Sequence, residues 1–491
     1  MDTSLRIFSA LMGLLFDFLL WDKQPGISVP IYTTTWAAAA MISLRKTEAR
    51  KAYLNYGLVG LILFSALMTA VRMAPIPLVL NIFLMGLLAV IVSLAYSSGL
   101  WTRFGVIDYL RQGLLLAGSF LAFPVFRQAG EVGGDDGGDR KARRKVFFAI
   151  MRGLLLAIPV LAVFIFLLTQ ADPIFFDILS SFIGGIDLET VTEWIVRTAL
   201  AVFFGNAFMA MVLHARKTSG TMDLIGEEKA LIPPFLGSIE TAVVLGSVLA
   251  LFTFFIGVQF RYFFFGHANI SAAGYTFSDY ARRGFGELVA SALISLALIF
   301  GLGLVRKDEG RQFDRWHLIL NSGLAVMVIA MLVSAFQRLA LYEQAYGFTR
   351  LRLYAHVFMV WLGIMLAAVV VIIIRKTPRR FLNVALAAVI GLSMTLNLIN
   401  VDGTIVRLNI RNARNTGQLD GEYLTSLSYD ALPALARAAG DPSMPLAIKI
   451  TAANVLEAFE ERLAEWEAEE HGWQSFHFSR WRAKRFIGTT R

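Results

Sequence analysis

Apolar runs long enough to cross a lipid bilayer recur through the first 400 residues, and the connections between them alternate in arginine and lysine content. In the run Ala355–Ile374, His356 is the single ionisable side chain. A helix of about 20 apolar residues spans the hydrocarbon core of a bilayer. Hydrophobic residues make up 57% of the chain. The predicted fold class is therefore all-α, a polytopic bundle of transmembrane helices.

We predict about eleven spans from the lengths of these runs. They cover residues 5–20, 27–44, 53–71, 75–96, 147–169, 190–213, 239–260, 284–304, 316–337, 354–374 and 381–399. Segment 106–126 is not counted, because its apolar core is short and is flanked by Arg111 and Pro124. We expect it to be interfacial or re-entrant. The first span is expected to stay in the protein, because Asp17 interrupts it and no cleavage site follows.

Basic residues decide the orientation of the spans. With the N-terminus inside, the inner connections carry most of the loop arginines and lysines, as the positive-inside rule requires. These residues are Arg45, Lys46, Arg50, Lys51, Arg127, Arg140, Lys141, Arg143, Arg144, Lys145, Arg216, Lys217, Lys229, Arg306, Lys307, Arg311, Arg315, Arg375, Lys376, Arg379 and Arg380. The predicted topology is N-in, C-out, which in a bacterium places the C-terminal region outside the cell (inner) membrane.

Four parts follow from this pattern. Residues 1–126 form N-terminal spans plus the interfacial segment, and 127–146 form a flexible basic cytoplasmic loop containing a Gly/Asp-rich stretch. Residues 147–400 form the main transmembrane bundle, and 401–491 form a small helical extracytoplasmic domain.

Charge and composition exclude several function classes. The formal net charge is +9, but residues 401–491 hold 11 basic and 12 acidic side chains, so the basic excess belongs to the membrane loops and no nucleic-acid partner is expected. Cysteine is absent, which excludes disulfides, thiolate metal sites and thiol catalysis. The six histidines show no metal-ligand spacing and no nucleotide-binding motif is present, so no metal and no cofactor are predicted.

Polar residues that break the positive-inside pattern indicate a candidate site. The outer connections are poor in basic residues except near Tyr275–Leu288 and Arg338–Arg352, and Asn400–Asn409 adds a third polar segment. Convergence of the three would build a ligand-binding site from Arg282, Arg283, Glu287, Glu343, Tyr346, Arg350, Asp402 and Arg407. Arginine binds carboxylates and phosphates in bidentate fashion, so the ligand would be an anion or a lipid phosphate. The alternative is that Arg283 and Glu287, four residues apart, form only a structural ion pair.

Charged residues within the predicted spans also indicate either structural pairs or functional sites, because charge is costly at membrane depth. Glu193 and Arg197 are four residues apart at the start of a span, which favours a structural pair over a relay. Asp17 has no evident partner in the sequence.

The C-terminal region has a different pattern. Asp430 is placed to cap a short helix that ends at Gly440, and a second helix is expected over 445–470. Its apolar stripe of Ala452, Val455, Leu456, Phe459, Leu463 and Trp466 predicts a packing surface. The aromatic and basic end from Trp473 to Arg485 either lies on lipid headgroups or packs on the helical domain.

Four motifs carry a resemblance to a known family. Tyr280–Leu288, Glu343–Arg350, Asn400–Ile410 and Leu427–Leu435 resemble, in combination and order, a bacterial family of multi-pass membrane proteins known only as a domain-of-unknown-function family. The similarity runs from about residue 145 to the C-terminus. It implies a bacterial cell-membrane location and no catalytic role.

The leading hypothesis is a non-enzymatic, transporter-like or sensing membrane protein with an Arg/Glu-lined outer site for an anionic or lipidic ligand. One alternative is a membrane-embedded enzyme acting on a lipid-linked substrate, with Glu287, Glu343 or Asp402 as acid or base. The other is a scaffold whose C-terminal domain binds a protein partner. The lipid bilayer is a partner under all three hypotheses.

Overall fold

The computed structural model describes residues 3–47, 52–121, 188–217, 234–264, 285–307 and 311–490, with Ser219 and single residues between 146 and 175. Within these residues every named element is a helix, as predicted, and one isolated bridge pairs Leu236 with Arg306. The helices in the first half are α1 (Thr3–Leu20), α2 (Ser28–Leu44), α3 (Ala52–Val71), α4 (Pro75–Ala95), α5 (Val106–Leu121) and α9 (Leu188–Lys217). Those of the central part are α10 (Ser238–Phe264), α13 (Phe285–Val305), α14 (Arg311–Tyr346), α15 (Arg350–Ile374) and α16 (Phe381–Leu398).

Nine of the described helices are long and apolar enough to cross a membrane, namely α1, α3, α4, α9, α10, α13, α14, α15 and α16. A helix satisfies its own backbone hydrogen bonds, which is why apolar segments in lipid adopt this form. The predicted span 27–44 forms α2, which is 17 residues long. The predicted span 147–169 falls outside the described residues, and each of the other predicted spans coincides with a described helix.

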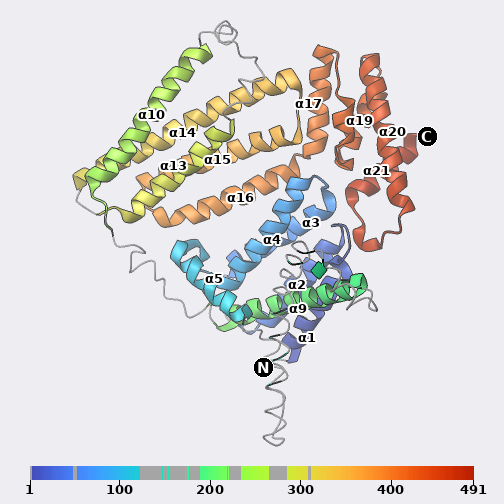
Figure 1. Ribbon diagram of the computed structural model, residues 1–491, viewed down its shortest axis with the longest axis horizontal. Helices are drawn as coiled ribbons and strands as arrows, with labels where there is room; N and C mark the ends of the chain where they lie inside the picture. The colour runs from blue at the N-terminus through green and yellow to red at the C-terminus, as the bar shows by residue number, and fades with distance from the viewer. Residues whose placement is uncertain are drawn as a thin grey trace, which may run out of the picture.

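The membrane helices pack in two groups that lie side by side (Figure 1). One group contains α1 to α5 and α9, whose buried residues include Met12, Leu88 and Phe208. The other contains α10 and α13 to α16, centred on Val328 and Leu366. Helices α4 and α16 join the groups through buried amides, because Asn81 Nδ2 donates to Asn397 Oδ1 at 3.0 Å and Asn397 Nδ2 donates back to Asn81 Oδ1 at 2.8 Å.

Helix α5 lies along α9. Gln112 Oε1 is 3.1 Å from His214 Nε2 near one end of α9, and Asn206 Nδ2 donates to the Phe120 carbonyl at 2.9 Å two turns further along. The segment expected to be interfacial or re-entrant therefore runs beside a candidate membrane span. Its continuation after Leu121 falls outside the described residues.

The chain after the last span forms a layer of shorter helices, which we call the C-terminal helices. They are α17 (Val401–Thr416), α18 (Gly421–Thr425), α19 (Leu432–Gly440), α20 (Leu446–Ala468) and α21 (Phe478–Thr490). Asn400 turns the chain into α17 with a left-handed backbone (φ 50°), and its side chain accepts a hydrogen bond from Gly403 N at 3.2 Å. Asparagine tolerates this conformation better than most residues.

The predicted stripe on 445–470 is confirmed as a packing surface, since Ala452, Val455 and Phe459 of α20 are buried. The expected capping role of Asp430 is wrong. Asp430 lies in a 3₁₀ turn (Tyr429–Ala431), and α19 begins after it without a side-chain cap. The Asp430 carboxyl is buried against the membrane helices and does not cap α19.

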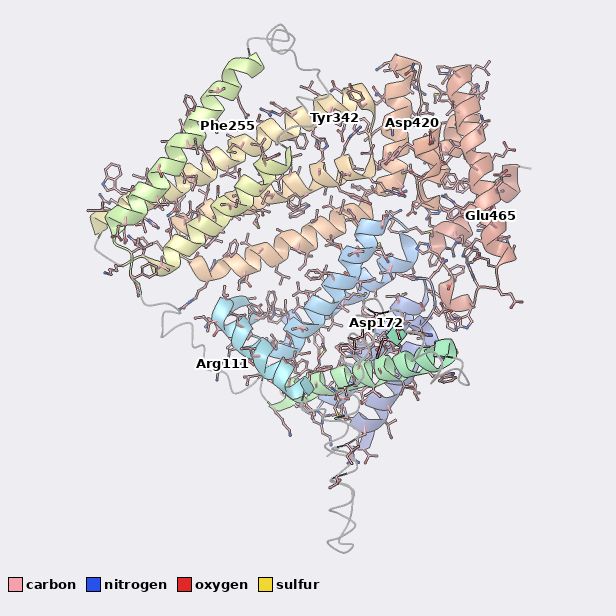
Figure 2. The ribbon with its side chains drawn as sticks, viewed as in Figure 1. Arg111, Asp172, Phe255, Tyr342, Asp420 and Glu465 are labelled. Carbon is pink, nitrogen blue, oxygen red and sulfur yellow. The ribbon has the colours of Figure 1, made fainter. Side chains whose placement is uncertain are left out.

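The C-terminal helices cover one end of the membrane helices, which we call the capped end (Figure 1). It contains the end of α3, the start of α15 and the turn between α1 and α2, because each makes hydrogen bonds to residues beyond 401. At the opposite end, the Asp314 carboxylate binds Arg306 Nη2 at 2.6 Å and Lys376 Nζ at 2.9 Å. Figure 2 shows side chains over both groups of membrane helices and the C-terminal layer.

Candidate functional site

A buried ion pair joins α15 to α17 at the capped end. Arg350 is the first residue of α15, and Asp402 lies in the first turn of α17. The guanidinium binds the carboxylate through Nε to Oδ1 at 2.8 Å and Nη2 to Oδ2 at 2.6 Å. The Asp402 side chain is fully buried, whereas that of Arg350 keeps 23% of its surface exposed. This is the bidentate geometry in which arginine binds a carboxylate most specifically.

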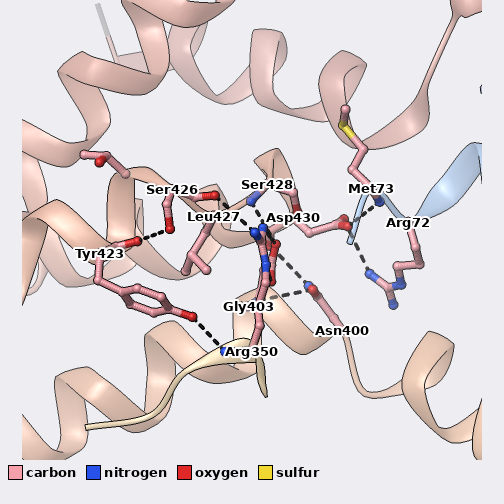
Figure 3. Close-up of polar contacts among 12 residues, drawn as sticks. Arg72, Met73, Arg350, Asn400, Gly403, Tyr423, Ser426, Leu427, Ser428 and Asp430 are labelled. Atoms are coloured by element: carbon pink, nitrogen blue, oxygen red, sulfur yellow. Dashed lines mark hydrogen bonds and ion pairs between the residues drawn. The ribbon is translucent and has the colours of Figure 1, made fainter. Parts of the chain in front are cut away.

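Backbone groups from the C-terminal helices complete this pair. Ser428 N donates to Asp402 Oδ2 at 2.8 Å, and Arg350 Nη1 donates to the Ser426 carbonyl at 3.2 Å. The Tyr423 hydroxyl accepts a hydrogen bond from Arg350 N at 2.7 Å (Figure 3). Burial raises the pKa of the Tyr423 hydroxyl, so that side chain is neutral at physiological pH. The carboxylate also benefits from the positive end of the α17 dipole.

A second buried acid, Asp430, contacts the first group of membrane helices. Its Oδ2 accepts a hydrogen bond from Met73 N at 3.0 Å, and Arg72 Nη1 lies 3.6 Å from Oδ1 (Figure 3). Arg72 also donates from Nε to the Asn397 carbonyl near the end of α16, at 2.7 Å. Burial raises the pKa of the Asp430 carboxyl, while the Met73 amide and the Arg72 charge oppose that rise. Arg72 therefore connects α3, α16 and the C-terminal layer.

The last helices reach back to the turn between α1 and α2. Arg480, 7% exposed, donates from Nη2 to Gln24 Oε1 at 2.8 Å and lies 3.7 Å from the centre of the Trp466 ring. Ile27 N donates to the Phe476 carbonyl at 2.8 Å. His477 is buried beside them and accepts a hydrogen bond from Ser479 N on Nδ1 at 3.1 Å. Burial, assisted by the Arg480 charge, lowers the pKa of His477 to about 4.

We call these contacts the charged joint, defined by Arg72, Arg350, Asp402, Asp430 and Arg480. It ties the C-terminal helices to both groups of membrane helices. In the described part of the chain, no group of three or more histidine or acidic side chains could hold a metal ion.

The structure brings together two of the eight residues predicted for the outer site, Arg350 and Asp402. Glu343, 2% exposed, instead lies 3.2 Å from His356 Nδ1, between α14 and α15. Tyr346 is 55% exposed, and its carbonyl accepts from Arg352 Nη1 at 3.2 Å.

The remaining predicted residues lie on other surfaces or outside the described chain. Arg407 is exposed on α17 and donates from Nη2 to Thr404 Oγ1 at 2.7 Å. Glu287 is exposed in the first turn of α13. Arg282 and Arg283 fall outside the described residues, so the expected pairing of Arg283 with Glu287 does too.

Sequence reasoning missed Arg72, Asp430 and Arg480 as members of the charged joint, and it missed the buried His477 beside them. A signal for Arg72 was present, since it stands alone between two long apolar runs on a connection otherwise free of charge. Asp430 gave no such signal, because a carboxylate before a short helix is an ordinary cap sequence. The unexplained Asp17 is now accounted for, since its carboxylate binds Arg197 at 2.8 and 2.9 Å, and Arg197 also contacts Glu193 as predicted.

The family model described as "Domain of unknown function (DUF4153)" matches residues 58–438. The match begins well before residue 145, where the resemblance in the sequence was expected to start, and it ends before α20. It includes Arg72, Arg350, Asp402 and Asp430. No curated protein and no solved structure matches the chain.

Proposed function

The chain belongs to the DUF4153 family of unknown function, and we propose that it is an integral membrane sensor whose C-terminal helices respond to an anionic ligand. The charged joint would pass the response to the membrane helices. The observation that carries this proposal is the buried, bidentate Arg350–Asp402 pair between α15 and α17.

The placement of the charges supports sensing over transport. Charges buried in an ion pair stabilise a protein less than apolar residues of similar size would, and they are best attested as devices that specify one arrangement. Here the pairs connect separate elements, Arg350 with Asp402 and Arg72 with Asp430. A pair that joins two movable parts and can open is the two-state element that a sensor requires.

Arg350 is the proposed point of ligand contact. Its guanidinium is partly exposed while the Asp402 carboxylate is fully buried, so an anion approaching from solvent would reach the arginine first. A carboxylate or phosphate offers Arg350 the same bidentate contact that Asp402 offers. Binding would therefore compete with Asp402 and loosen α17 from α15. Arg350 and Asp402 are therefore the two predicted outer-site residues that form the centre of the proposed ligand site.

We propose that the capped end faces outward in a bacterial cell membrane. The support is charge, because the connections at the opposite end carry Arg45, Lys46, Arg306, Arg375 and Arg380, and basic connections favour the cytoplasmic side. Labelling of a Glu461→Cys variant by a membrane-impermeant maleimide in intact cells tests this sidedness. Protection of that cysteine until the cells are lysed would contradict it.

The sensing proposal is tested by a distance between two spin labels. The chain lacks cysteine, so introduced cysteines can be labelled without background. One label is placed at Glu461→Cys on α20 and the other at Phe254→Cys on α10, where the Phe254 side chain is 72% exposed. Reconstituted protein is titrated with inorganic phosphate or with phosphatidylglycerol in the bilayer. We expect the distribution of distances between the two labels to shift with one of these two probes, phosphate or phosphatidylglycerol. Asp402→Asn should give the shifted distribution without any probe, because it weakens the hold on Arg350.

Two variants control this experiment. Arg350→Gln removes the proposed contact and should abolish the response to the probes. Arg407→Gln removes an exposed arginine of α17, the helix that carries Asp402, and should respond like the wild type. An unchanged distribution in Asp402→Asn, together with no response of the wild type to either probe, would contradict the proposal.

A further inference from the structure

Four aromatic side chains, two in the connection between α20 and α21 and two on α21, are exposed next to the end of α1 and the start of α2. They are Trp473, Phe476, Phe478 and Trp481, with exposed fractions of 55%, 37%, 38% and 44%. The rings of Phe476 and Phe478 lie 5.5 Å apart, and those of Phe478 and Trp481 lie 6.2 Å apart. We call this set the aromatic patch. A water-facing surface would not ordinarily expose several large rings together.

The aromatic patch continues the lipid-facing surface of α1. Phe18, in the last turn of α1, is 56% exposed, and its ring lies 6.4 Å from that of Trp473. Gln474 Nε2 donates to the Phe18 carbonyl at 3.4 Å, and Ile27 N donates to the Phe476 carbonyl at 2.8 Å. Both bonds hold the patch at the level where the membrane helices end. Tryptophan is favoured at this level of a bilayer.

The chain segment that carries the patch is basic. Residues 471–491 contain five basic side chains and no acidic one, namely Arg480, Arg482, Lys484, Arg485 and Arg491. Arg482 and Lys484 are exposed on α21, although Lys484 also binds Glu467 Oε1 at 2.8 Å. Basic side chains beside a membrane surface are attracted to anionic lipids.

A row of three acidic side chains occupies another surface of the same layer. Glu457, Glu461 and Glu465 are exposed and follow one another at intervals of four residues, so they share one face of α20. Glu465 lies on the side of the layer away from the membrane helices (Figure 2). An anionic surface would repel that face and attract α21, which orients the layer.

We propose that the aromatic patch and α21 dock on the anionic phospholipid headgroups of the bilayer in which the membrane helices lie. The rings sit among the headgroups, and Arg482 and Lys484 contact lipid phosphates. For the exposed rings of residues 473–485, we thus propose the first of the two alternatives that the sequence left open, contact with lipid headgroups. Arg480 packs inside the C-terminal layer, and the exposed rings face lipid.

Single spin labels test the docking in full-length protein. Trp473→Cys and Arg482→Cys are labelled in protein reconstituted in phosphatidylcholine with and without phosphatidylglycerol. Arg482→Cys keeps all four rings, so it reports even where Trp473→Cys disturbs the patch. Collision rates with oxygen, which concentrates in lipid, and with a water-soluble nickel chelate report the depth of each label. Glu461→Cys is the water-facing control, and Phe254→Cys is the lipid-facing benchmark.

We expect both labels in phosphatidylglycerol bilayers to be several-fold less accessible to nickel, relative to oxygen, than the label at Glu461→Cys. In phosphatidylcholine alone this protection should fall. Labels as accessible to nickel as Glu461→Cys in both bilayers would overturn the proposal. Equal protection in both bilayers would overturn the assignment to anionic headgroups.

Discussion

Buried ionisable side chains at and beside the charged joint are held in defined protonation states by their surroundings. His477 is 4% exposed, and burial together with the Arg480 charge lowers its pKa to about 4. Backbone groups of Thr69 and Arg72 act in the opposite direction without cancelling that shift. The neutral ring accepts the Ser479 N–H on Nδ1. Protonation of Nδ1 would remove this acceptor and bury a second cation beside Arg480.

This state of His477 makes stability depend on pH. The unfolded chain takes up the proton near 6.5, the ordinary histidine pKa, and the folded protein takes it up near 4. Stability contributed by neutral His477 is therefore fully present above pH 6.5 and is lost as pH falls toward 4, up to about 3 kcal/mol. Melting temperatures of the detergent-solubilised wild type should fall over this range, and those of His477→Gln should fall less.

The difference between the two proteins isolates this histidine, because Asp430 contributes with the opposite sign. The Asp430 pKa is raised in the folded state, so its contribution is largest at low pH and declines as pH rises through the folded pKa. Equal slopes of melting temperature against pH in wild type and His477→Gln would show that burial does not hold His477 neutral.

Helices α1 and α9 pack closely because small residues line their contact. Ser9 Oγ donates to the Gly205 carbonyl at 2.7 Å, and a Cβ added at Gly205 would lie 2.6 Å from the Ser9 carbonyl oxygen. A Cβ at Gly13 would overlap the Ala201 carbonyl. Small residues let membrane helices approach closely, which replaces the hydrophobic driving force absent in lipid. Asp17 and Arg197 then pair at the capped end of the same two helices.

Gly13→Val should therefore separate α1 from α9. Overpacking a tight contact costs about 1–3 kcal/mol, and the Asp17–Arg197 pair would be strained as well. Gly246→Val in α10 is the matched control, because an added Cβ there meets no atom within 4 Å. Thermal unfolding in one detergent should give a lower midpoint for Gly13→Val and a nearly unchanged midpoint for Gly246→Val. Equal midpoints would contradict the close α1–α9 contact.

For the whole molecule, the sequence predicted the membrane helices well because their signal is local. A run such as Ala355–Ile374 specifies its own helix. The charged joint depends on long-range pairing instead, since Arg72 and Asp430 are far apart in the chain yet lie 3.6 Å from each other. Neither residue type reports a distant partner. The prediction came closest at Arg350, an arginine against the positive-inside pattern, and at Asp402 in a polar segment of the same side.

The charged joint connects the C-terminal helices with both groups of membrane helices. The C-terminal helices contact the turn between α1 and α2, the end of α3 and the start of α15, so they bridge both groups of membrane helices. Asn81 and Asn397 add a buried amide contact between the two groups inside the membrane. We therefore expect motion of the C-terminal layer to alter how the two groups pack.

The central claim is that Arg350 and Asp402 act as one coupled pair, and a double-mutant cycle tests it most directly. Unfolding free energies are measured in mixed micelles for Arg350→Gln, Asp402→Asn, the double variant and the exposed control Arg407→Gln. Arg350→Gln should cost about 3–5 kcal/mol, because it leaves the fully buried Asp402 carboxylate without its partner. Asp402→Asn should cost less, because the Arg350 guanidinium is partly exposed to solvent. The double variant should cost at least about 1 kcal/mol less than the two single changes added together, with Arg407→Gln near wild type. Strict additivity of the two changes would contradict the coupled joint.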